Sequence, residues 1–445
     1  MSADRHRHGE MAPIGHGKLR QLLAYGQQVF GLDSLLAGVR DERRSPRVAT
    51  VLVMRSIFLC GLLRIRSFNA LEPKLAEPAM QHALGARVRA KPLCSVDTLA
   101  YTLARTDVAS ARHAVVRLIQ KAERNKVFRE GWHAAMRIVA VDGWEPFSSY
   151  DRHCPACLTR EVKVKQGDVT VTRTQYYHAF VVAMLIGDRL DVVLDMEPIQ
   201  SADVRTEGKG KTGGHEGELT AAKRLVARLR TTYGKWIDAV VVDALYANGP
   251  FLTVARDAGL GVFVILKKAG DEPLKDALLL FKGKHADAVV KRNDEYIELW
   301  DQKDIRTLST YDGPIRVTRA HVQRDKAGTS HVWCVGTTGC KATRLHPAQI
   351  LAIARGRWHI ENTAFHQFTT GWKFDHVFTH GPVAIPALFW LFLLAFNLLQ
   401  IFLYRQLTSY GRARGNSVNR TISRLTDEML DDLARITTAI DWRSD

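Results

Sequence analysis

The stretch Arg137–Glu145, "RIVAVDGWE", marks the point where a helical sequence pattern gives way to a β-rich one. Four successive apolar residues from Ile138 to Val141 predict a buried strand, and Asp142 follows directly. An acidic side chain at the end of an apolar strand lies at the rim of a sheet, where sites form in open α/β folds. The stretch therefore predicts both the first strand of a sheet and a candidate site residue.

The residues that follow continue the pattern of a layered α/β fold. Apolar runs predict strands, and amphipathic stretches between the later ones predict helices. In chain order these are strands at 137–145, 176–187 and 190–199, a helix at 215–233, a strand at 236–246, a helix at 250–259 and a strand at 262–268. The order β-β-β-α-β-α-β predicts a mixed sheet with helices packed on it.

The rest of the chain divides around this core. Residues 18–132 read as helical with many basic side chains, which suits either a DNA-binding domain or a helical cap with a solvated charged face. The expected parts are a disordered N-terminus at 1–17, the helical domain at 18–132, the core at 133–269, a β-rich insertion at 270–345, the end of the core at 346–407 and a basic tail at 408–445.

Composition points to a polyanionic partner. The chain has 445 residues with 63 Lys and Arg against 46 Asp and Glu, which gives a net charge of +17. Such an excess favours nucleic acid or an anionic membrane, although a basic protein without such a partner is the alternative. Six cysteines do not make a disulfide scaffold, and the first 18 residues lack the apolar core of a signal peptide.

One segment tests whether the chain crosses a membrane. Pro386–Tyr404, "PALFWLFLLAFNLLQIFLY", is nearly long enough to span a bilayer. Asn397 and Gln400 interrupt it, and no second candidate accompanies it. The segment therefore predicts a buried core helix, with a membrane span as the alternative.

Three acids are the strongest candidates for chemistry. Asp142 and Asp243 each end an apolar strand, and Glu361 lies in a helix begun by Pro347, on one face with Arg357 and two phenylalanines. Two carboxylates on neighbouring strands repel each other unless a cation lies between them. Mg²⁺ prefers carboxylate oxygens, and three acids supply enough charge for two ions about 3.5–4 Å apart.

These features, in this order, resemble the DDE transposases of bacterial insertion sequences, which have a ribonuclease-H-like core. The resemblance rests on "VDGWEPFSS", "VVVDALYANGPF" and "RWHIEN", the last after a β-rich insertion, and it covers residues 137 to about 405. It implies a ribonuclease-H-like mixed sheet flanked by helices, with Asp142, Asp243 and Glu361 as the catalytic, metal-binding triad. The implied cofactor is Mg²⁺, which Mn²⁺ can replace.

The resemblance also implies an activity and a setting. The activity is metal-dependent cleavage and strand transfer at terminal inverted repeats, by a homodimer on DNA in a prokaryotic cytoplasm, without a membrane. A ribonuclease-H-like nuclease without strand transfer and an inactive DNA-binding relative are the alternatives. In the family's Tyr-x2-Arg-x3-Glu-x6-Lys signature, this chain has Ala354 and Phe368 at the tyrosine and lysine positions, with Lys373 five residues late.

Several further residues are candidate DNA contacts. Arg357 is suited to gripping a phosphate or orienting Glu361, and a simple helical ion pair is the alternative. Asn362 and His366 follow on the same helix, and Lys209 and Lys211 lie in "RTEGKGKTGG" (205–214). That loop lacks the first glycine of a Walker A motif, so we predict a basic segment rather than an ATP site.

Other polar residues near these motifs have competing explanations. Glu145 is a rival carboxylate to Asp142. Glu218 begins the helix at 215–233, where stabilisation of the helix N-terminus is the favoured role. Packing between two helices is the favoured explanation for Trp372 and His376, and stacking on an unpaired base is the alternative.

The motif "HCPACL" (153–158) offers a candidate structural zinc site at Cys154 and Cys157, with His153 or His178 as further ligands. Zinc needs four ligands, and the sequence shows no second Cys or His pair at the usual spacing. We favour the alternative, a hairpin with reduced thiols.

Overall fold

The computed structural model describes residues 17–129, 135–187, 190–202, 214–267, 272–292, 294–324, 328–407 and 416–442, with side chains between 416 and 421 left out. Lys209, Lys211 and the turn residue Asp188 lie outside the described residues.

Five strands form the central sheet. They are β1 (Ile138–Ser149), β3 (Val169–Ile186), β4 (Val192–Pro198), β5 (Ala239–Val242) and β6 (Gly261–Ile265). Their order is β4-β3-β1-β5-β6, in which β1, β5 and β6 run parallel while β3 is antiparallel to both of its core neighbours. With α9 (Glu218–Tyr233) after β4 and α10 (Gly249–Asp257) after β5, the predicted β-β-β-α-β-α-β order is confirmed. The fold is the expected ribonuclease-H-like mixed sheet.

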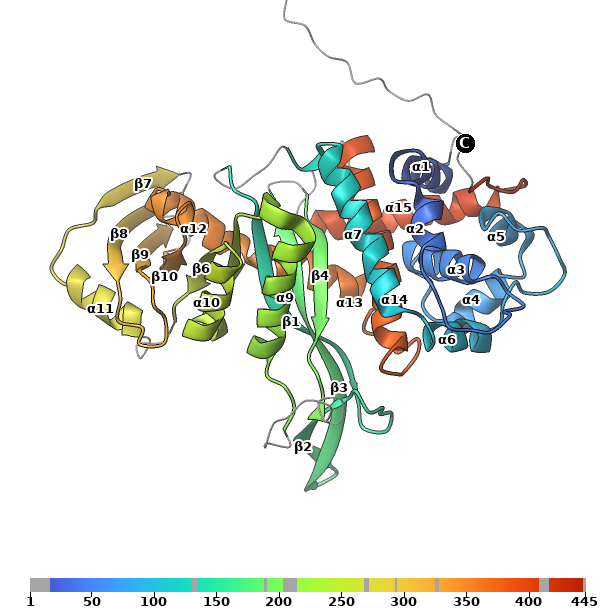
Figure 1. Ribbon diagram of the computed structural model, residues 1–445, viewed down its shortest axis with the longest axis horizontal. Coiled ribbons are helices and arrows are strands. Elements are labelled where there is room, and N and C mark those ends of the chain that lie inside the picture. The colour runs from blue at the N-terminus through green and yellow to red at the C-terminus, as the bar shows by residue number, and fades with distance from the viewer. Residues whose placement is uncertain are drawn as a thin grey trace, which may run out of the picture.

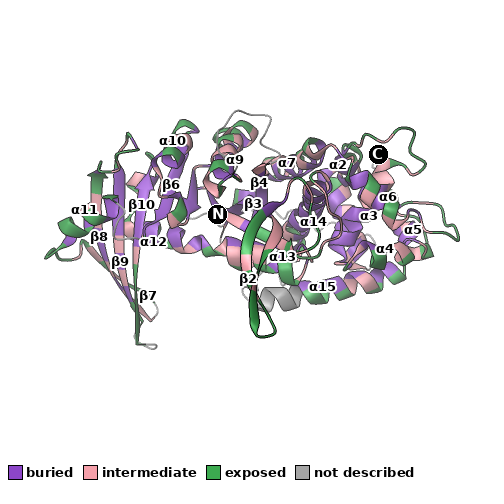
Figure 2. Ribbon diagram, turned by 90° about the horizontal axis from the view of Figure 1, so that it is seen from below, coloured by how far each residue is buried: buried purple, intermediate pink, exposed green. Residues whose placement is uncertain are grey.

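A long two-stranded ribbon projects from this sheet and was not predicted. Strand β2 (Leu158–Gln166) pairs with the first half of β3, which begins at Val169 rather than Tyr176. Figure 1 shows the ribbon extending away from the layers, and Figure 2 shows that it is largely exposed. Because both faces meet solvent, its residues lack the apolar pattern that announces a buried strand.

The segment predicted as a β-rich insertion extends the same sheet. Its strands are β7 (Ala288–Arg292), β8 (Glu295–Ile305), β9 (Ile315–Arg324) and β10 (Thr329–Thr338). Strand β10 pairs antiparallel with β6, so the ten strands form one sheet. The segment also contains a helix that was not predicted, α11 (Glu272–Phe281).

Helices cover the β4 end of the molecule (Figure 1). The N-terminal helices are α1 (Lys18–Tyr25), a π-helical turn η1 (Gly26–Phe30), α2 (Leu32–Ala37), α3 (Thr50–Leu62), α4 (Phe68–Lys74), α5 (Pro78–Ala83), α6 (Val96–Leu103) and α7 (Val108–Arg124). Short 3₁₀ turns lie at Val127–Arg129, Gly234–Trp236, Ala244–Tyr246 and Ala342–Arg344. The hydrophobic core runs without a break from these helices into the sheet.

The apolar segment is the helix α14 (Ala384–Gln406), which packs against α3, α7 and β4. Among the described helices it alone is long and apolar enough to cross a membrane, but 94% of its most apolar window is buried in the protein. Its one fully buried polar residue, Asn397, bonds both the N–H and the C=O of Val193 on β4. The prediction of a buried core helix is confirmed.

The C-terminal segment, predicted as a basic tail, contains the helix α15 (Asn416–Ala434), which packs on α1 and α5. The buried Asp432 pairs with Arg20 of α1 at 2.6 Å. Beyond the helix, Trp442 is buried and donates to the carbonyl of Ala83 at 2.9 Å. This end of the chain is therefore anchored on the N-terminal helices.

Candidate active site

The central strands bring Asp142 and Asp243 to the same rim of the sheet. Strands β1 and β5 are paired in parallel as far as Ala140 and Val241, and each aspartate lies two positions beyond that pair. Asp142 accepts a hydrogen bond from the Gly143 N–H at 3.0 Å. Asp243 caps the following 3₁₀ turn by accepting from the Leu245 N–H at 2.8 Å. Asp243 directly follows β5, whereas Asp142, predicted to end its strand, lies inside β1 just beyond the point where its pairing with β5 stops.

Glu361 reaches this rim from a helix that is not a regular α-helix throughout. Helix α12 (Pro347–Gly356) leads into a π-helical segment (Ile360–Phe365), and α13 (His366–Thr370) follows. The sequence predicted one uninterrupted helix. The π-turn widens the backbone at Glu361, and such turns are common at functional sites.

A single guanidinium joins the first and third acids. Arg357 donates to Asp142 Oδ2 at 2.8 Å and to Glu361 Oε1 at 2.8 Å. Its side chain is only 5% exposed, whereas that of Glu361 is 36% exposed. The helical ion pair considered from the sequence is present, and Arg357 also bonds Asp142 on a strand from a distant part of the chain, so it links the two carboxylates.

The acids share more negative charge than Arg357 neutralises. Burial raises the pKa of Asp142 to about 7; Arg357 lowers it, while Asp243 and Glu361 raise it further. The charges of Asp243 and Glu361 therefore both act on Asp142. The donor set is hard carboxylate oxygen, which suits a divalent cation such as Mg²⁺.

A fourth acid, Glu218, also belongs to this cluster. It begins α9, as predicted, but its carboxylate accepts from the Tyr246 hydroxyl at 2.6 Å. It also lies so close to Gly143 that an added Cβ there would come within 2.3 Å of it. Burial and the charge of Asp243 raise its pKa, and the Tyr246 hydrogen bond lowers it. The sequence missed this position because the start of a helix already explained the acid locally.

Aromatic packing fixes the Glu361 helix against β1. Trp144, two residues after Asp142, stacks on Phe365 at 6.1 Å and packs on Phe368 at 5.2 Å. Phe368 is 1% exposed and stacks on Phe374 at 4.6 Å. The position that holds lysine in the family signature is therefore a core position in this chain.

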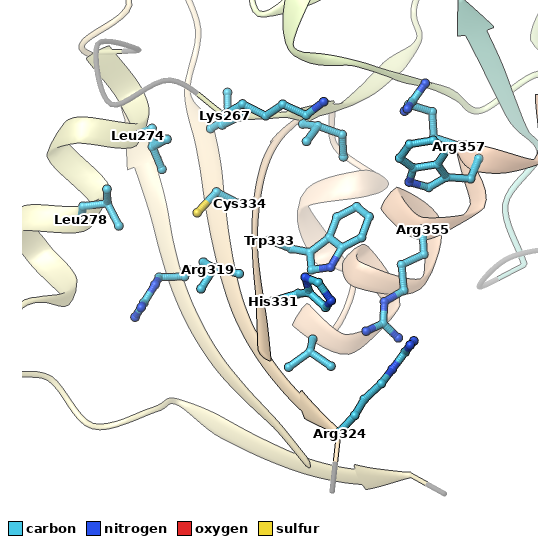
Figure 3. Close-up of a pocket in the computed structure, with 15 residues that line it drawn as sticks. Lys267, Leu274, Leu278, Arg319, Arg324, His331, Trp333, Cys334, Arg355 and Arg357 are labelled. Atoms are coloured by element: carbon cyan, nitrogen blue, oxygen red, sulfur yellow. The ribbon is translucent and has the colours of Figure 1, made fainter. Parts of the chain in front are cut away.

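A basic pocket adjoins the acid cluster (Figure 3). It lies between the end of β6, the strands β9 and β10, α11 and the end of α12, and Arg357 lines its inner side. Its lining includes the basic side chains of Lys267, Arg319, Arg324, Arg355 and Arg357, and the imidazole of His331. Arg324 and Arg355 pair with Glu295. The exposed indole of Trp358, 43% exposed, also lines it. A pocket of this character suits a phosphate backbone or an unpaired base.

The remaining predicted residues divide into accessible and inaccessible ones. Asn362 and His366 are exposed on the outer face of the π-turn and α13. Glu145 is engaged by Arg160 in a bidentate pair at 2.7 and 2.8 Å. Trp372 is 1% exposed and packs on Phe396, which agrees with the favoured explanation of packing between helices. His376 is exposed and packs on Phe378.

The predicted Cys-x2-Cys motif lies at the base of the β2–β3 ribbon. Cys154 and Cys157 are unlinked, with their sulfurs 3.8 Å apart. His178 lies beside them, and so does His380, which the sequence did not suggest. His153 instead stacks on Tyr176 at 4.8 Å.

Carboxylates gathered at the rim of a ribonuclease-H-like sheet, beside a cationic pocket, define a class: metal-dependent enzymes of phosphoryl transfer on nucleic acid. Residues 204–398, which include Asp243 and Glu361, match the family model described as "Transposase DDE domain". The match identifies a transposase DDE domain over these residues, which supports the function of a DNA transposase.

Comparisons with whole proteins found little sequence similarity. A solved structure described as the piggyBac transposase synaptic complex with hairpin DNA is 9% identical, with a TM-score of 0.43, and the likeness covers 93% of this chain and 81% of that chain. No curated protein matches the sequence significantly.

Proposed function

We propose that Asp142, Asp243 and Glu361 hold Mg²⁺, or Mn²⁺ in its place, for cleavage and strand transfer at the ends of a prokaryotic insertion sequence. The observation that carries the proposal is the Arg357 guanidinium, bonded at 2.8 Å to both Asp142 and Glu361. A helix and a strand that are far apart in sequence thus present their acids to one cationic group at the sheet rim. Buried ion pairs add little net stability on their own, so this convergence supports a chemical role.

The charge balance of the cluster supports metal binding. Arg357 bonds Asp142 and Glu361, Asp243 and Glu218 add further negative charge, and the pKa of Asp142 is raised to about 7. A divalent cation would supply the missing positive charge and hold Asp142 ionised at neutral pH. When bound, such ions activate the attacking water or 3′-hydroxyl and stabilise the leaving oxygen.

Each protein group then has a defined task. Arg357 holds Asp142 and Glu361 in a fixed relation through its planar fork. Glu218 accepts a hydrogen bond from Tyr246 and packs closely against Gly143, which keeps the backbone beside Asp142 in place. The aromatic contacts of Trp144 keep the Glu361 helix from moving relative to β1. The protein thus positions the acids before metal or DNA arrives.

DNA would approach across the basic pocket and the exposed end of the helix that carries Glu361. The pocket presents Lys267, Arg319 and Arg355, and Arg357, which also lines it, bonds Asp142 and Glu361. Asn362 and His366 are exposed further along the Glu361 helix. Lys209 and Lys211 remain predicted contacts from the loop that precedes α9. The N-terminal helices and the β2–β3 ribbon are proposed as additional DNA-binding parts, since both carry exposed basic residues.

Transposition requires two element ends to be held together, so we propose a homodimer on DNA. Labelled candidate ends with inverted repeats, incubated with protein and Mg²⁺, test the function. Nicking and joining of the 3′ end to a target duplex are the expected products. Cleavage without joining would favour a nuclease, and binding without cleavage would favour an inactive relative.

A further inference from the structure

Four side chains that the acid cluster does not use converge at the base of the β2–β3 ribbon. Cys154 and Cys157 lie on the loop between β1 and β2, His178 on β3, and His380 between α13 and α14. One ligand atom from each lies within 4.8 Å of every other. These ligand atoms are gathered closely enough to share one ion.

Four of the six distances between ligand atoms match a tetrahedral ion, and all six are within 4.8 Å. With Zn–S near 2.3 Å and Zn–N near 2.0–2.1 Å, the edges of a Cys₂His₂ tetrahedron are about 3.3–3.8 Å. The two sulfurs are 3.8 Å apart, and His178 Nε2 lies 3.5 Å from Cys154 Sγ and 3.4 Å from Cys157 Sγ. His380 Nε2 lies 3.3 Å from Cys157 Sγ. Each of these four separations falls within the expected range.

The local backbone supports thiolate ligands. The Cys154 N–H points at Cys157 Sγ at 3.3 Å, and the Cys157 N–H bonds the Cys154 carbonyl at 2.9 Å, so the motif forms a closed turn. The Ser201 hydroxyl holds that turn by donating to the Pro155 carbonyl at 2.6 Å. A backbone N–H directed at sulfur stabilises a negatively charged ligand.

The orientation of the histidines is explained by the cluster and not by other hydrogen bonds. His178 is only 6% exposed, and its Nε2 faces both sulfurs. His380 Nδ1 is buried without a partner, while its Nε2 faces Cys157. A hydrophobic packing role alone would not turn two imidazole nitrogens toward the same pair of thiols.

We infer that Cys154, Cys157, His178 and His380 bind one structural Zn²⁺. Four protein ligands close the coordination sphere, so this ion has no open position for catalysis. It ties the ribbon base to the segment that connects the Glu361 helix with α14. The inference corrects our preference for reduced thiols in a hairpin and replaces His153 with His380; it stands independently of the proposed Mg²⁺ site.

Metal analysis of the full-length protein tests the site. Protein purified without chelators should contain close to one zinc ion per chain. His380→Gln and Cys154→Ser should each lower that content strongly. His153→Ala, in the same loop, and Cys340→Ser, an exposed free cysteine, should leave it unchanged. Protein without zinc, or zinc content unaffected by His380→Gln, would overturn the inference.

Cobalt substitution tests the site in the unmodified protein, so the result does not depend on whether a variant folds. Co²⁺ exchanged into the unmodified protein should give the intense ligand-field and thiolate charge-transfer bands of a tetrahedral S₂N₂ site. Weak bands typical of octahedral oxygen coordination would contradict it. Glu361→Gln should retain the tetrahedral spectrum, so the outcome is separate from that of the proposed catalytic site.

Discussion

At the scale of single residues, Arg357 makes the most specific prediction. Replacing it with alanine removes the group that orients Asp142 and Glu361, so end cleavage should fall about 100-fold or more. The same change makes the cluster more negative, so the rise in melting temperature on adding Mg²⁺ should be retained or enlarged. Cleavage assays and thermal melts with and without Mg²⁺ measure the two effects.

A matched control is Arg424→Ala, which removes an exposed ion pair with Glu428 on α15. It should change neither measurement. Loss of the Mg²⁺ effect in Arg357→Ala, or normal cleavage, would show that the arginine does not act as a positioning residue.

Substitution of Phe368 tests why this chain lacks the lysine of the transposase signature at that position. The side chain is 1% exposed among Trp144, Phe374 and Phe396. Phe368→Lys buries an ammonium without a partner and loses aromatic packing, so unfolding free energy should fall by about 3–5 kcal/mol. His366→Lys, on the exposed side of the same helix, should leave stability nearly unchanged. Denaturant titration of both variants checks this, and a stable, more active Phe368→Lys would contradict it.

The candidate site was partly predictable at this scale. Asp142 and Asp243 are visible in the sequence because each directly follows a run of apolar residues. Glu218 and His380 have no such signal, since their roles depend on contacts with Tyr246 and Cys157 that only the folded chain brings about.

At the scale of elements, α14 shows how one polar residue fixes a helix on a strand. Asn397 bonds the N–H and C=O of Val193 at 2.9 and 2.7 Å, which satisfies the backbone of β4 at the sheet edge. Asn397→Leu should cost about 2–4 kcal/mol, because both buried backbone groups lose their partner. Denaturant unfolding measures the loss, and faster hydrogen exchange of the Val193 amide should accompany it. An unchanged exchange rate of the Val193 amide would mean that another group accepts its hydrogen bond.

Element prediction succeeded where burial leaves a pattern. The apolar cores of β1, β5 and β6 and the length of α14 follow directly from composition. The β2–β3 ribbon was missed because it is exposed on both faces, and the π-turn at Glu361 was missed because it leaves the helical periodicity almost intact. Strands β10 and β6 pair although they are far apart in the sequence, and no local pattern predicts such a pairing.

At the scale of the whole molecule, the charge of +17 predicts how DNA binding responds to salt. Each lysine that contacts a phosphate contributes about 0.9 to the slope of log affinity against log salt. Lys163→Gln combined with Lys165→Gln on the ribbon should therefore reduce the slope by about 1–2. Lys235→Gln, exposed near the opposite end of β5, is the control and should not change it. An unchanged slope in the ribbon variant would show that these two lysines do not contact DNA phosphates.

The central claim is that three acids from distant parts of the chain form one metal-dependent catalytic centre. The most direct measurement is Mg²⁺-dependent cleavage of a labelled element end by Asp142→Asn, Asp243→Asn, Glu361→Gln and the control Glu145→Gln. We predict a loss of at least about 1,000-fold in each triad variant and near-normal cleavage in the control, whose side chain is bonded to Arg160. Cleavage at the parent rate by any one of the three triad variants would contradict the account.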